Sequence, residues 1–507
     1  MSGLGPLDLA VVGVYLAGVV ALGTLAGGRQ ESTRDYFLAG SGLPWWAISL
    51  SVVATETSAL TFISVPAVSY GGDFWFLQLA AGYLVGRVAV AALLLPGYFR
   101  GDYLTAYAFL EHRFGPSARR FASVAFLVTR ALGDSVRLFA VAIPVALVTG
   151  LPYAGAIALA GGATLLYTYR GGLRSVVWVD VAQMALYVVG GVAALVLLVR
   201  AVPGGWEGIV AAGRDAGRFR ILHVAGGPAD ARWVVTGLVG GAFLSLASHG
   251  VDHLIVQRLL AARGLAAARR AVVASGFLVF AQFALFLTVG VGLFAYYGGR
   301  PFATNDEVLT AFVIERFPPG LAGLIVAALL AAAMSTVSSS LNALASSTTL
   351  DLYAPLTGRS GADLLRAGRR FTLAWAVILT GGAILFQFAA SDTPVVVVAL
   401  QVASFTYGGL LGAYLLGLVV PAAGERQVVI AMATTFMIMT ALWAVQQFGV
   451  VRPLFHGLWY AAVGALLTVV VGWGATRAAG GVRRISVKGS SEVRERSSSG
   501  HRNVTDR

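Results

Sequence analysis

The stretch Ser51-Val-Val-Ala-Thr-Glu-Thr-Ser-Ala-Leu-Thr61 places a glutamate and several hydroxyl side chains in the middle of an apolar run. The run begins near Leu43 and reaches Pro66, with Gly71-Gly72 beyond it. An ionisable residue inside a membrane span costs about 2.5 to 3.5 kcal/mol on insertion scales, so a functional reason for it is expected by default. Such a polar stretch also makes a poor continuous helix. The sequence therefore predicts a membrane span that is interrupted near its middle.

A second polar segment reads Ala331-Ala-Ala-Met-Ser-Thr-Val-Ser-Ser-Ser-Leu-Asn342 and stacks its hydroxyl side chains over little more than one helical turn. Hydroxyls and loosened backbone carbonyls are hard oxygen donors of the kind that an alkali cation needs. The structural alternative is that each hydroxyl donates to a carbonyl one turn earlier, which is common in membrane helices. The segment alone leaves both interpretations open.

A third polar segment, Ser248-His-Gly-Val-Asp252-His253, ends another apolar run with a glycine and an acid. Transporters built from two inverted repeats carry an interrupted helix in each half, where freed carbonyls and half-helix ends hold ion and substrate near the bilayer midplane. The runs that contain Glu56 and Asp252 are the second and the seventh of the chain. They are five apart, as two five-helix repeats require, so the spacing predicts a transporter of this kind.

The composition of the whole chain is that of an integral membrane protein. Of its 507 residues, 58% are hydrophobic and 12% are charged, and the mean hydropathy is +0.80, whereas soluble domains carry about a quarter charged residues. We expect one transmembrane transporter domain over residues 1–476 and a disordered basic cytoplasmic tail, rich in Ser, Gly and Arg, over residues 477–507. The chain has no cysteine, which excludes disulfides, thiolate nucleophiles and cysteine-bound metals.

Runs of about twenty apolar residues, bounded by charge, Gly or Pro, predict about thirteen transmembrane helices. Backbone polar groups find no water partner in lipid, so the expected fold class is all-α integral membrane. The first run lacks the basic start of a signal peptide and is expected to stay as a helix. The runs begin near Leu7, Leu43, Phe74, Arg120, Leu151, Val176, Trp233, Val272, Gly320, Phe371, Pro394, Val428 and Leu458.

The net charge of +13 indicates membrane topology rather than nucleic-acid binding, because the arginines gather in alternate loops and in the tail. Short loops rich in Lys and Arg stay in the cytoplasm. An odd number of spans then places the N-terminus outside and the C-terminus inside the cell membrane. The loop from Ala201 to Arg232 is also basic but is long enough to weaken the rule. The cytoplasmic arginines are Arg29, Arg34, Arg113, Arg119, Arg120, Arg170, Arg174, Arg258, Arg263, Arg269, Arg270, Arg359, Arg366, Arg369, Arg370 and Arg426.

Five motifs in this order resemble the sodium:solute symporter family, which includes the sodium/glucose, proline, iodide, monocarboxylate and multivitamin carriers. The likeness covers nearly the whole membrane region. The motifs are Asp35-Tyr-Phe-Leu-Ala-Gly40, Leu104-Thr-Ala-Tyr-Ala-Phe-Leu-Glu-His-Arg-Phe114, Tyr167-Thr-Tyr-Arg-Gly-Gly-Leu-Arg-Ser-Val-Val-Trp-Val-Asp-Val-Ala-Gln183, Asp252-His-Leu-Ile-Val-Gln-Arg-Leu-Leu-Ala-Ala-Arg263 and the stretch from Ser335 to Tyr353 that ends Thr349-Leu-Asp-Leu-Tyr.

The resemblance implies the fold of the leucine transporter, with two inverted five-helix repeats and extra helices at the ends. It implies that sodium is the co-transported ion, and that no catalytic residue is needed. By position, the family's sodium site falls on the backbone carbonyls of Ala54, Thr57 and Ala332 and on the hydroxyls of Ser335 and Thr336.

Asp180 matches a family acid near the cytoplasmic ion path, where a carboxylate lowers the cost of a passing cation. The structural alternative is a salt bridge from Asp180 to Arg174 or Arg170.

The substrate positions depart from those of the sugar carriers that the chain resembles. An Asn and a Gln of those carriers are replaced here by Glu56 and Thr61, and their Asn-Gln-Tyr is Asp252-His253-Leu254. The stretch from Leu104 to Phe114 is nearer to the iodide, monocarboxylate and multivitamin branch, whose substrates are anions. The candidates for substrate binding are Glu56, Ser58, Thr61, Arg130, Asp252, His253 and Gln401.

Arg130, Asp134 and Arg137 lie one helical turn apart on the fourth run, so one face could present a guanidinium to a substrate carboxylate, which it grips with two parallel hydrogen bonds. The structural alternative is that Asp134 neutralises either arginine.

The energetics of anion uptake favour a second cation. One sodium ion that enters down about 100 mV gains roughly 2.3 kcal/mol, and a tenfold gradient adds about 1.4 kcal/mol. A monovalent anion that moves with one sodium ion keeps only the gradient contribution, so its accumulation stops at about tenfold. Glu56 and Asp252 are the acids placed to hold a second cation or a proton. Uptake is then expected to be electrogenic.

We therefore expect a sodium-coupled secondary active transporter that takes up a small organic solute or anion by alternating access in the lipid bilayer, without an obligatory protein partner. The alternatives are a proton-coupled carrier of the same fold and a transporter-like membrane sensor, although the tail is too short for an output domain. An enzyme is not expected. His249 and His253 have ligand spacing on a helix, but a zinc site needs a third ligand.

Overall fold

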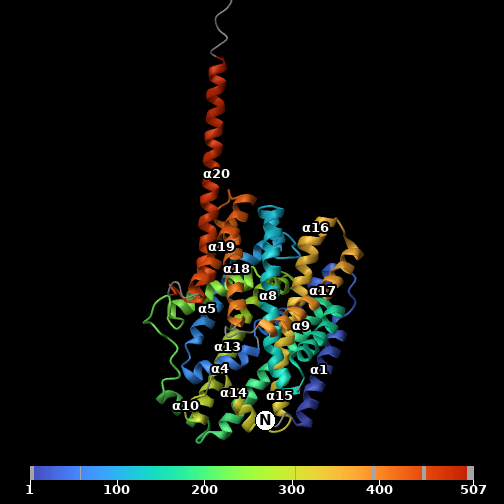
Figure 1. Ribbon diagram of the computed structural model, residues 1–507, viewed down its shortest axis with the longest axis vertical. Helices are drawn as coiled ribbons and strands as arrows, with labels where there is room; N and C mark the ends of the chain where they lie inside the picture. Colours follow the sequence, from blue (N-terminus) through green and yellow to red (C-terminus); the bar gives the residue numbers. More distant parts are fainter. Residues whose placement is uncertain are drawn as a thin grey trace, which may run out of the picture.

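The computed structural model describes residues 5–57, 59–149, 151–302, 304–389, 395–447 and 453–498. Within these ranges the chain is helical, and the pairing of Leu43 with Ala262 is an isolated bridge rather than a strand. The helices pack side by side as an elongated bundle (Figure 1). The expected all-α fold is confirmed.

The thirteen expected runs fall on helices or bent helix pairs of the described residues. Among the described residues, seven helices are long and apolar enough to cross a membrane, and two bent pairs raise the number to nine. Helix α9 covers two runs, and the apolar stretches of α8, α17 and α18 include side chains outside the described residues.

The first repeat contains α3 (Trp45–Glu56) with α4 (Ala59–Gly71), α5 (Phe76–Ala89) with η2 (Val90–Leu94) and α6 (Leu95–Arg100), α8 (Pro116–Thr149) and α9 (Tyr153–Ala201). The second contains η3 (Thr236–Gly240) with α11 (Gly241–Gly250) and α12 (His253–Leu260), α13 (Leu265–Tyr297), α15 (Leu321–Ser347) with η4 (Thr348–Tyr353) and α16 (Ala354–Thr357), α17 (Gly361–Ala389) and α18 (Val395–Val419).

The remaining helices lie before, within, between and after the repeats. The membrane helices outside the repeats are α1 (Pro6–Gly27), α19 (Glu425–Gln447) and α20 (Tyr460–Ser498). The short helices are α2 (Thr33–Leu38), η1 (Ala39–Ser41), α7 (Ala108–Arg113), α10 (Gly205–Asp215), α14 (Glu307–Arg316) and η5 (Gly457–Trp459).

Both predicted interruptions are present. Helix α3 ends at Glu56, Thr57 takes the extended backbone angles φ −80° and ψ 113°, and the chain continues at an angle of 69°. In the second repeat, α12 leaves the direction of η3 and α11 at 61°. The Asp252 carboxylate caps α12 by accepting the backbone N–H of Leu254 at 2.9 Å. The polar residues that made these runs poor continuous helices are those at the bends.

The boundary between the fifth and sixth spans is a kink inside α9. Gly172 has φ 55° and ψ −151°, angles that L side chains rarely adopt. A Cβ at this position would lie 2.2 Å from the carbonyl oxygen of Tyr36. The glycine therefore both turns the helix and lets α2 approach it.

The expected tail of residues 477–507 stays a prediction, and residues 499–507 lie outside the described residues. Helix α20 continues without a break to Ser498 and projects beyond the rest of the bundle (Figure 1).

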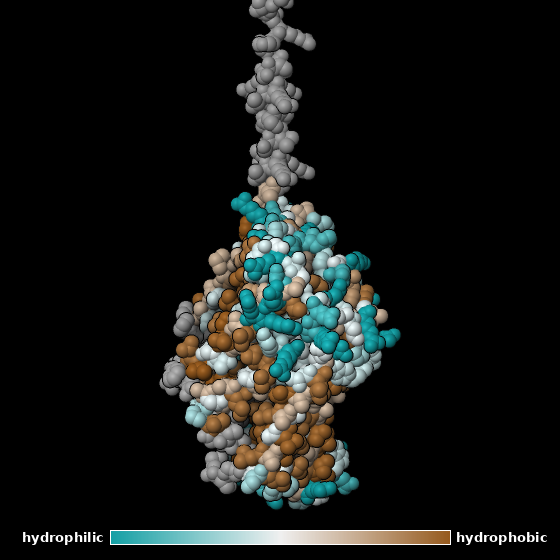
Figure 2. Space-filling model, turned by 90° about the vertical axis from the view of Figure 1, so that its right-hand side faces the viewer, coloured by the Kyte–Doolittle hydropathy of each residue, from teal (hydrophilic) through white to brown (hydrophobic). Residues whose placement is uncertain are grey.

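The surface has an apolar region and a hydrophilic end. Figure 2 shows hydrophobic residues covering the lower part of one face and hydrophilic residues gathered above them. Arg359, Arg366 and Arg370 line a surface pocket where α16 and α17 meet, and Figure 1 places the N-terminus at the opposite end of the bundle. An apolar surface beneath a basic end is the pattern of a membrane-embedded protein.

Candidate ion and substrate site

A cavity of about 400 Å³ lies where the two interrupted spans meet. The first interruption contributes Thr55, Glu56 and Thr57 to its lining, and the second contributes His249 and Asp252. Aromatic side chains complete the wall, namely Phe76, Tyr83, Phe283 and Tyr407. A cavity of this size with a few converging polar groups suits a small solute.

Glu56 is held at this cavity by two basic side chains. Its carboxylate accepts Nη2 of Arg87 at 2.5 and 2.7 Å, and Oε2 lies 3.1 Å from Nε2 of His249. Arg87 is fully buried and also donates to Ser275 Oγ at 2.6 Å. The contact between Glu56 and His249 joins the two interrupted spans across the cavity.

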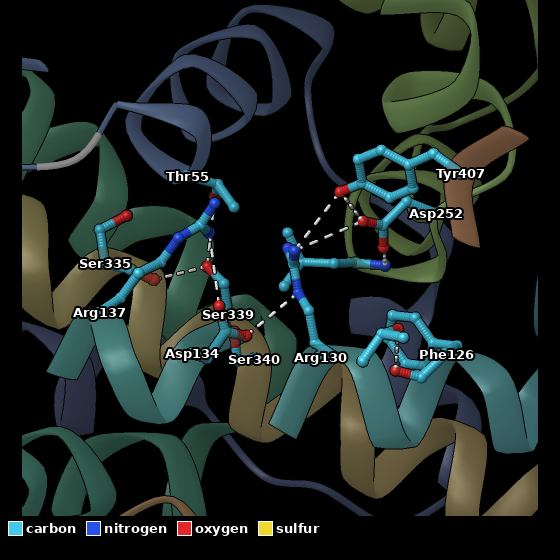
Figure 3. A network of polar contacts seen from close by, with 12 residues as sticks. Thr55, Phe126, Arg130, Asp134, Arg137, Asp252, Ser335, Ser339, Ser340 and Tyr407 are labelled. Carbon is cyan, nitrogen blue, oxygen red and sulfur yellow. Dashed lines mark hydrogen bonds and ion pairs between the residues drawn. The ribbon is translucent and has the colours of Figure 1, made fainter. Parts of the chain in front are cut away.

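The fourth span brings a chain of charges to the same cavity, and Figure 3 shows how these side chains contact one another. Asp134 Oδ2 lies 3.1 Å from Nε of Arg130, and Asp134 Oδ1 lies 3.4 Å from Nη1 of Arg137. Nη1 of Arg130 lies 3.5 Å from Oδ2 of Asp252, which accepts the hydroxyl of Tyr407 at 2.6 Å. Asp134 thus contacts both arginines, as the structural alternative requires, and both arginines also line the cavity.

A second, much smaller cavity of about 10 Å³ has room for one water-sized particle. Its lining includes four of the five expected sodium ligands, namely Ala54, Thr57, Ala332 and Ser335. Helix α3 ends beside it, so the carbonyls of its last turn lose their helical partners. Thr336 is not part of the lining, and its hydroxyl donates to the Ala332 carbonyl at 3.2 Å. That bond is the back-bonding alternative named for this segment.

Asp180 lies buried beside Ser335. Its carboxylate accepts the hydroxyls of Ser335 and Ser51, both at 2.6 Å. Nη2 of Arg258 lies 3.2 Å from Asp180 Oδ2, and the Arg258 side chain is fully buried. Among the described ion pairs, the partner of Asp180 is therefore Arg258 and not Arg174 or Arg170.

The other substrate candidates fall in different places. Thr61 lines the large cavity. His253 does not: its Nδ1 accepts the backbone N–H of Ala106 at 3.3 Å, and its Nε2 lies 3.1 Å from Ser346 Oγ. Ser58 and the side chain of Gln401 lie outside the described residues.

Sequence reasoning missed two buried arginines, Arg87 and Arg258, and assigned His249 only to a zinc alternative. The signal for Arg87 was present, because a lone arginine interrupts the apolar run that begins near Phe74. Arg258 was placed with the cytoplasmic arginines, which is wrong, since it lies inside the bundle. Among the described residues, no group of three His, Cys, Asp or Glu side chains is arranged to hold a metal ion.

A helical membrane bundle in which two interrupted spans meet at a polar cavity defines a secondary transporter. The family model described as "Sodium:solute symporter family" matches residues 36–433, and the chain belongs to this family. The resemblance seen in the sequence motifs is confirmed.

Relatives and solved structures agree with this assignment. The chain is 27% identical to the sodium/sialic acid symporter NanT of Aliivibrio fischeri, over 92% of each chain. It is 27% identical to the human sodium-coupled monocarboxylate transporter 1, over 86% of this chain and 70% of the relative. A solved substrate-bound, outward-open structure of a Na⁺-coupled sialic acid symporter has a TM-score of 0.83 and 25% identity, and the match covers 94% of this chain and 98% of that one.

The protein is therefore a multi-pass membrane transporter, a sodium-coupled symporter that works by alternating access. Sodium is the co-transported ion, and the fold is that of the leucine transporter. Its relatives are transporters of small solutes and not enzymes.

Proposed function

We propose that the chain takes up a small organic anion that carries a carboxylate, together with sodium. The observation that carries the proposal is that two arginines of one helix, Arg130 and Arg137, reach the cavity between the interrupted spans. A guanidinium binds a carboxylate through two parallel hydrogen bonds. The names of the relatives fit this chemistry, because they include sialic acid and monocarboxylate carriers.

Both arginines keep donors for such a substrate. A guanidinium has five N–H donors, and the contact of Arg137 with Asp134 uses one of them at 3.4 Å. The Arg137 side chain is 29% exposed. Arg130 reaches Asp252 at 3.5 Å, longer than a strong charged hydrogen bond. A substrate carboxylate can therefore compete with these acids.

The sodium ligands that we propose are the carbonyls of Ala54, Thr57 and Ala332 and the hydroxyls of Ser335 and Thr336. The small cavity that four of them line supports this assignment. The Ser335 hydroxyl donates a hydrogen bond to Asp180, so the lone pairs of the Ser335 oxygen remain available to a cation. Asp180 is the proposed ion-path residue, because its charge stabilises a cation that passes Ser335.

We also propose that the protein lies in the cell membrane with the N-terminus outside and the C-terminus in the cytoplasm. The arginine-rich loops support this orientation. Digestion of a C-terminal tag in right-side-out vesicles tests it, and cleavage by external protease would contradict it.

The substrate proposal is tested with purified protein and proteoliposomes. We expect sialic acid or lactate to raise the melting temperature in the presence of sodium, and glucose to leave it unchanged. Arg137→Gln should raise the KM for the carboxylate at least about tenfold. Arg120→Gln is the matched control, because Arg120 is an exposed arginine on the same helix. Equal transport of glucose, or an unchanged KM in Arg137→Gln, would contradict the proposal.

A further inference from the structure

The small cavity has a polar lining residue that the expected ligand set does not include. Gln183 lines it together with Ala54, Ala332 and Ser335. The Gln183 side chain is buried, and its Oε1 has no hydrogen-bond partner within the described residues. Leaving a buried polar atom unpaired costs about 1 to 3 kcal/mol. Such atoms in native proteins call for an explanation, and a bound ion is one of them.

The amide nitrogen of Gln183 is turned toward Tyr15, and its oxygen is the end without a partner among the described residues. Nε2 donates to the hydroxyl of Tyr15 at 3.0 Å. In this arrangement that hydroxyl accepts from the amide, and its own proton points to Sδ of Met334 at 3.9 Å. The oxygen is therefore the atom that Gln183 can offer to the small cavity.

The ligand set also has a place for one more oxygen. Four of the five proposed ligands line the small cavity, and Thr336 does not. A dehydrated alkali ion is held by oxygens that replace its hydration shell, and the amide oxygen of Gln183 is of that type. Gln183 also lies three residues after Asp180, and residues at this spacing share one face of a helix. Helix α9 thus brings a carboxylate and an amide oxygen to the same side of α15.

We propose that the amide oxygen of Gln183 is a further sodium ligand and sets the affinity for the ion. The proposal rests on the sodium site proposed above and adds to it a side chain from a third span. The charge of Asp180 is shared with Arg258, whereas the Gln183 oxygen is committed to no other group among the described residues.

The test measures sodium binding rather than transport. The melting temperature of the purified full-length protein is followed against NaCl, with choline chloride holding the ionic strength constant. Gln183→Met keeps the length of the side chain and removes the oxygen. It should raise the apparent Kd for sodium at least about tenfold, because a charge–dipole contact is lost.

Gln257→Met is the matched control. Gln257 is also fully buried, its Nε2 also donates, to Phe37 O and Asn342 Oδ1, and its Oε1 also has no described partner. It does not line the small cavity. This variant should lower the melting temperature and leave the Kd for sodium within about twofold of wild type.

An unchanged Kd in Gln183→Met would overturn the proposal. If that variant does not fold, Gln183→Glu serves instead: it keeps the shape, adds a charge, and should tighten sodium binding, so an unchanged or weaker Kd would overturn the proposal. The double variant Ser335→Ala, Thr336→Ala distinguishes failure of the proposed sodium site from failure of the Gln183 assignment. If it retains wild-type sodium binding, the proposed site is wrong. If it loses binding while Gln183→Met keeps it, the Gln183 assignment alone is wrong.

Discussion

Single charged residues in the interior affect the stability of this protein and line its large cavity. Arg87 is the clearest case, since it is fully buried and its countercharge is Glu56. A buried ion pair adds little net stability, but removing one partner leaves an uncompensated charge in a medium of low dielectric constant. Pairs of this kind are therefore sensitive to single substitutions and tolerant of double ones.

Glu56→Gln tests this asymmetry. We expect it to lower the free energy of unfolding by about 3 to 5 kcal/mol, because Arg87 stays buried without its partner. The double variant Glu56→Gln, Arg87→Met removes both charges and should recover most of the loss. Melting curves of the three proteins in detergent measure the effect. A single variant as stable as wild type would show that Arg87 finds water or another acid.

The hydroxyls of Ser335 and Thr336 are the residues on which sodium coupling is expected to depend. Replacing both with alanine should abolish sodium-dependent accumulation and leave folding intact, because the packing change is small. Counterflow in proteoliposomes with and without sodium measures this. Thr129→Ala is a control, since the Thr129 hydroxyl donates to carbonyls of its own helix. Accumulation that persists in the double variant would show that sodium does not bind at these hydroxyls of α15.

The sequence predicted the polar residues of the site better than it predicted their partners. Glu56, Asp252 and Ser335 were found because polar side chains in apolar runs are rare and local in the sequence. The partners of Glu56 and Asp180 are Arg87 and Arg258, which are distant along the chain. Ion pairing across such distances depends on how the helices pack, and the local sequence pattern does not predict that packing. His253 was chosen by its place in a motif, yet it lies outside the cavity.

At the level of helices, the interruptions could be predicted and the long α9 could not. Both bends follow residues with low helix propensity and high polarity, which are visible in the sequence. The division of α9 depends on the conformation of Gly172, and a glycine pair in an apolar sequence does not reveal its backbone angles. The expected boundary at Leu151 describes the start of this helix within a few residues, since α9 begins at Tyr153.

Gly172→Ala is a test of the α9 kink. The methyl group of the alanine would clash with the Tyr36 carbonyl, and the alanine backbone would have to adopt a positive φ. We expect a loss of more than about 1 kcal/mol in the free energy of unfolding. Gly162→Ala on the same helix is the control, because a Cβ there meets no atom within 4 Å. The control should be neutral or slightly stabilising, as alanine favours helix over glycine. Equal melting temperatures would show that the kink tolerates a side chain.

For the whole molecule, the question is how many charges move in one cycle. The acids expected to hold a second cation, Glu56 and Asp252, are each paired with an arginine. An organic anion that enters with one sodium ion would then be carried without net charge, and its accumulation would be limited to about the sodium gradient. Accumulation beyond that limit needs a further cation.

We keep the expectation that uptake of a carboxylate is electrogenic. Proteoliposomes loaded with potassium and treated with valinomycin set an inside-negative potential, which should accelerate sodium-dependent uptake. The same vesicles without valinomycin are the control. A rate that is independent of potential would mean that one sodium ion and one anion move together, and that both acids remain paired with their arginines throughout the cycle.

The contact between Glu56 and His249 links the two bent spans across the cavity. If the two spans move together, the contacts that must break when the cavity opens to the other side of the membrane are those with the surrounding helices. The ion pair of Arg130 with Asp252 is one of these contacts. A substrate carboxylate that binds Arg130 would displace Asp252 and so break this ion pair. A carrier without bound substrate would keep this ion pair and would not change the side to which its cavity opens. Sodium would then not leak inward without substrate.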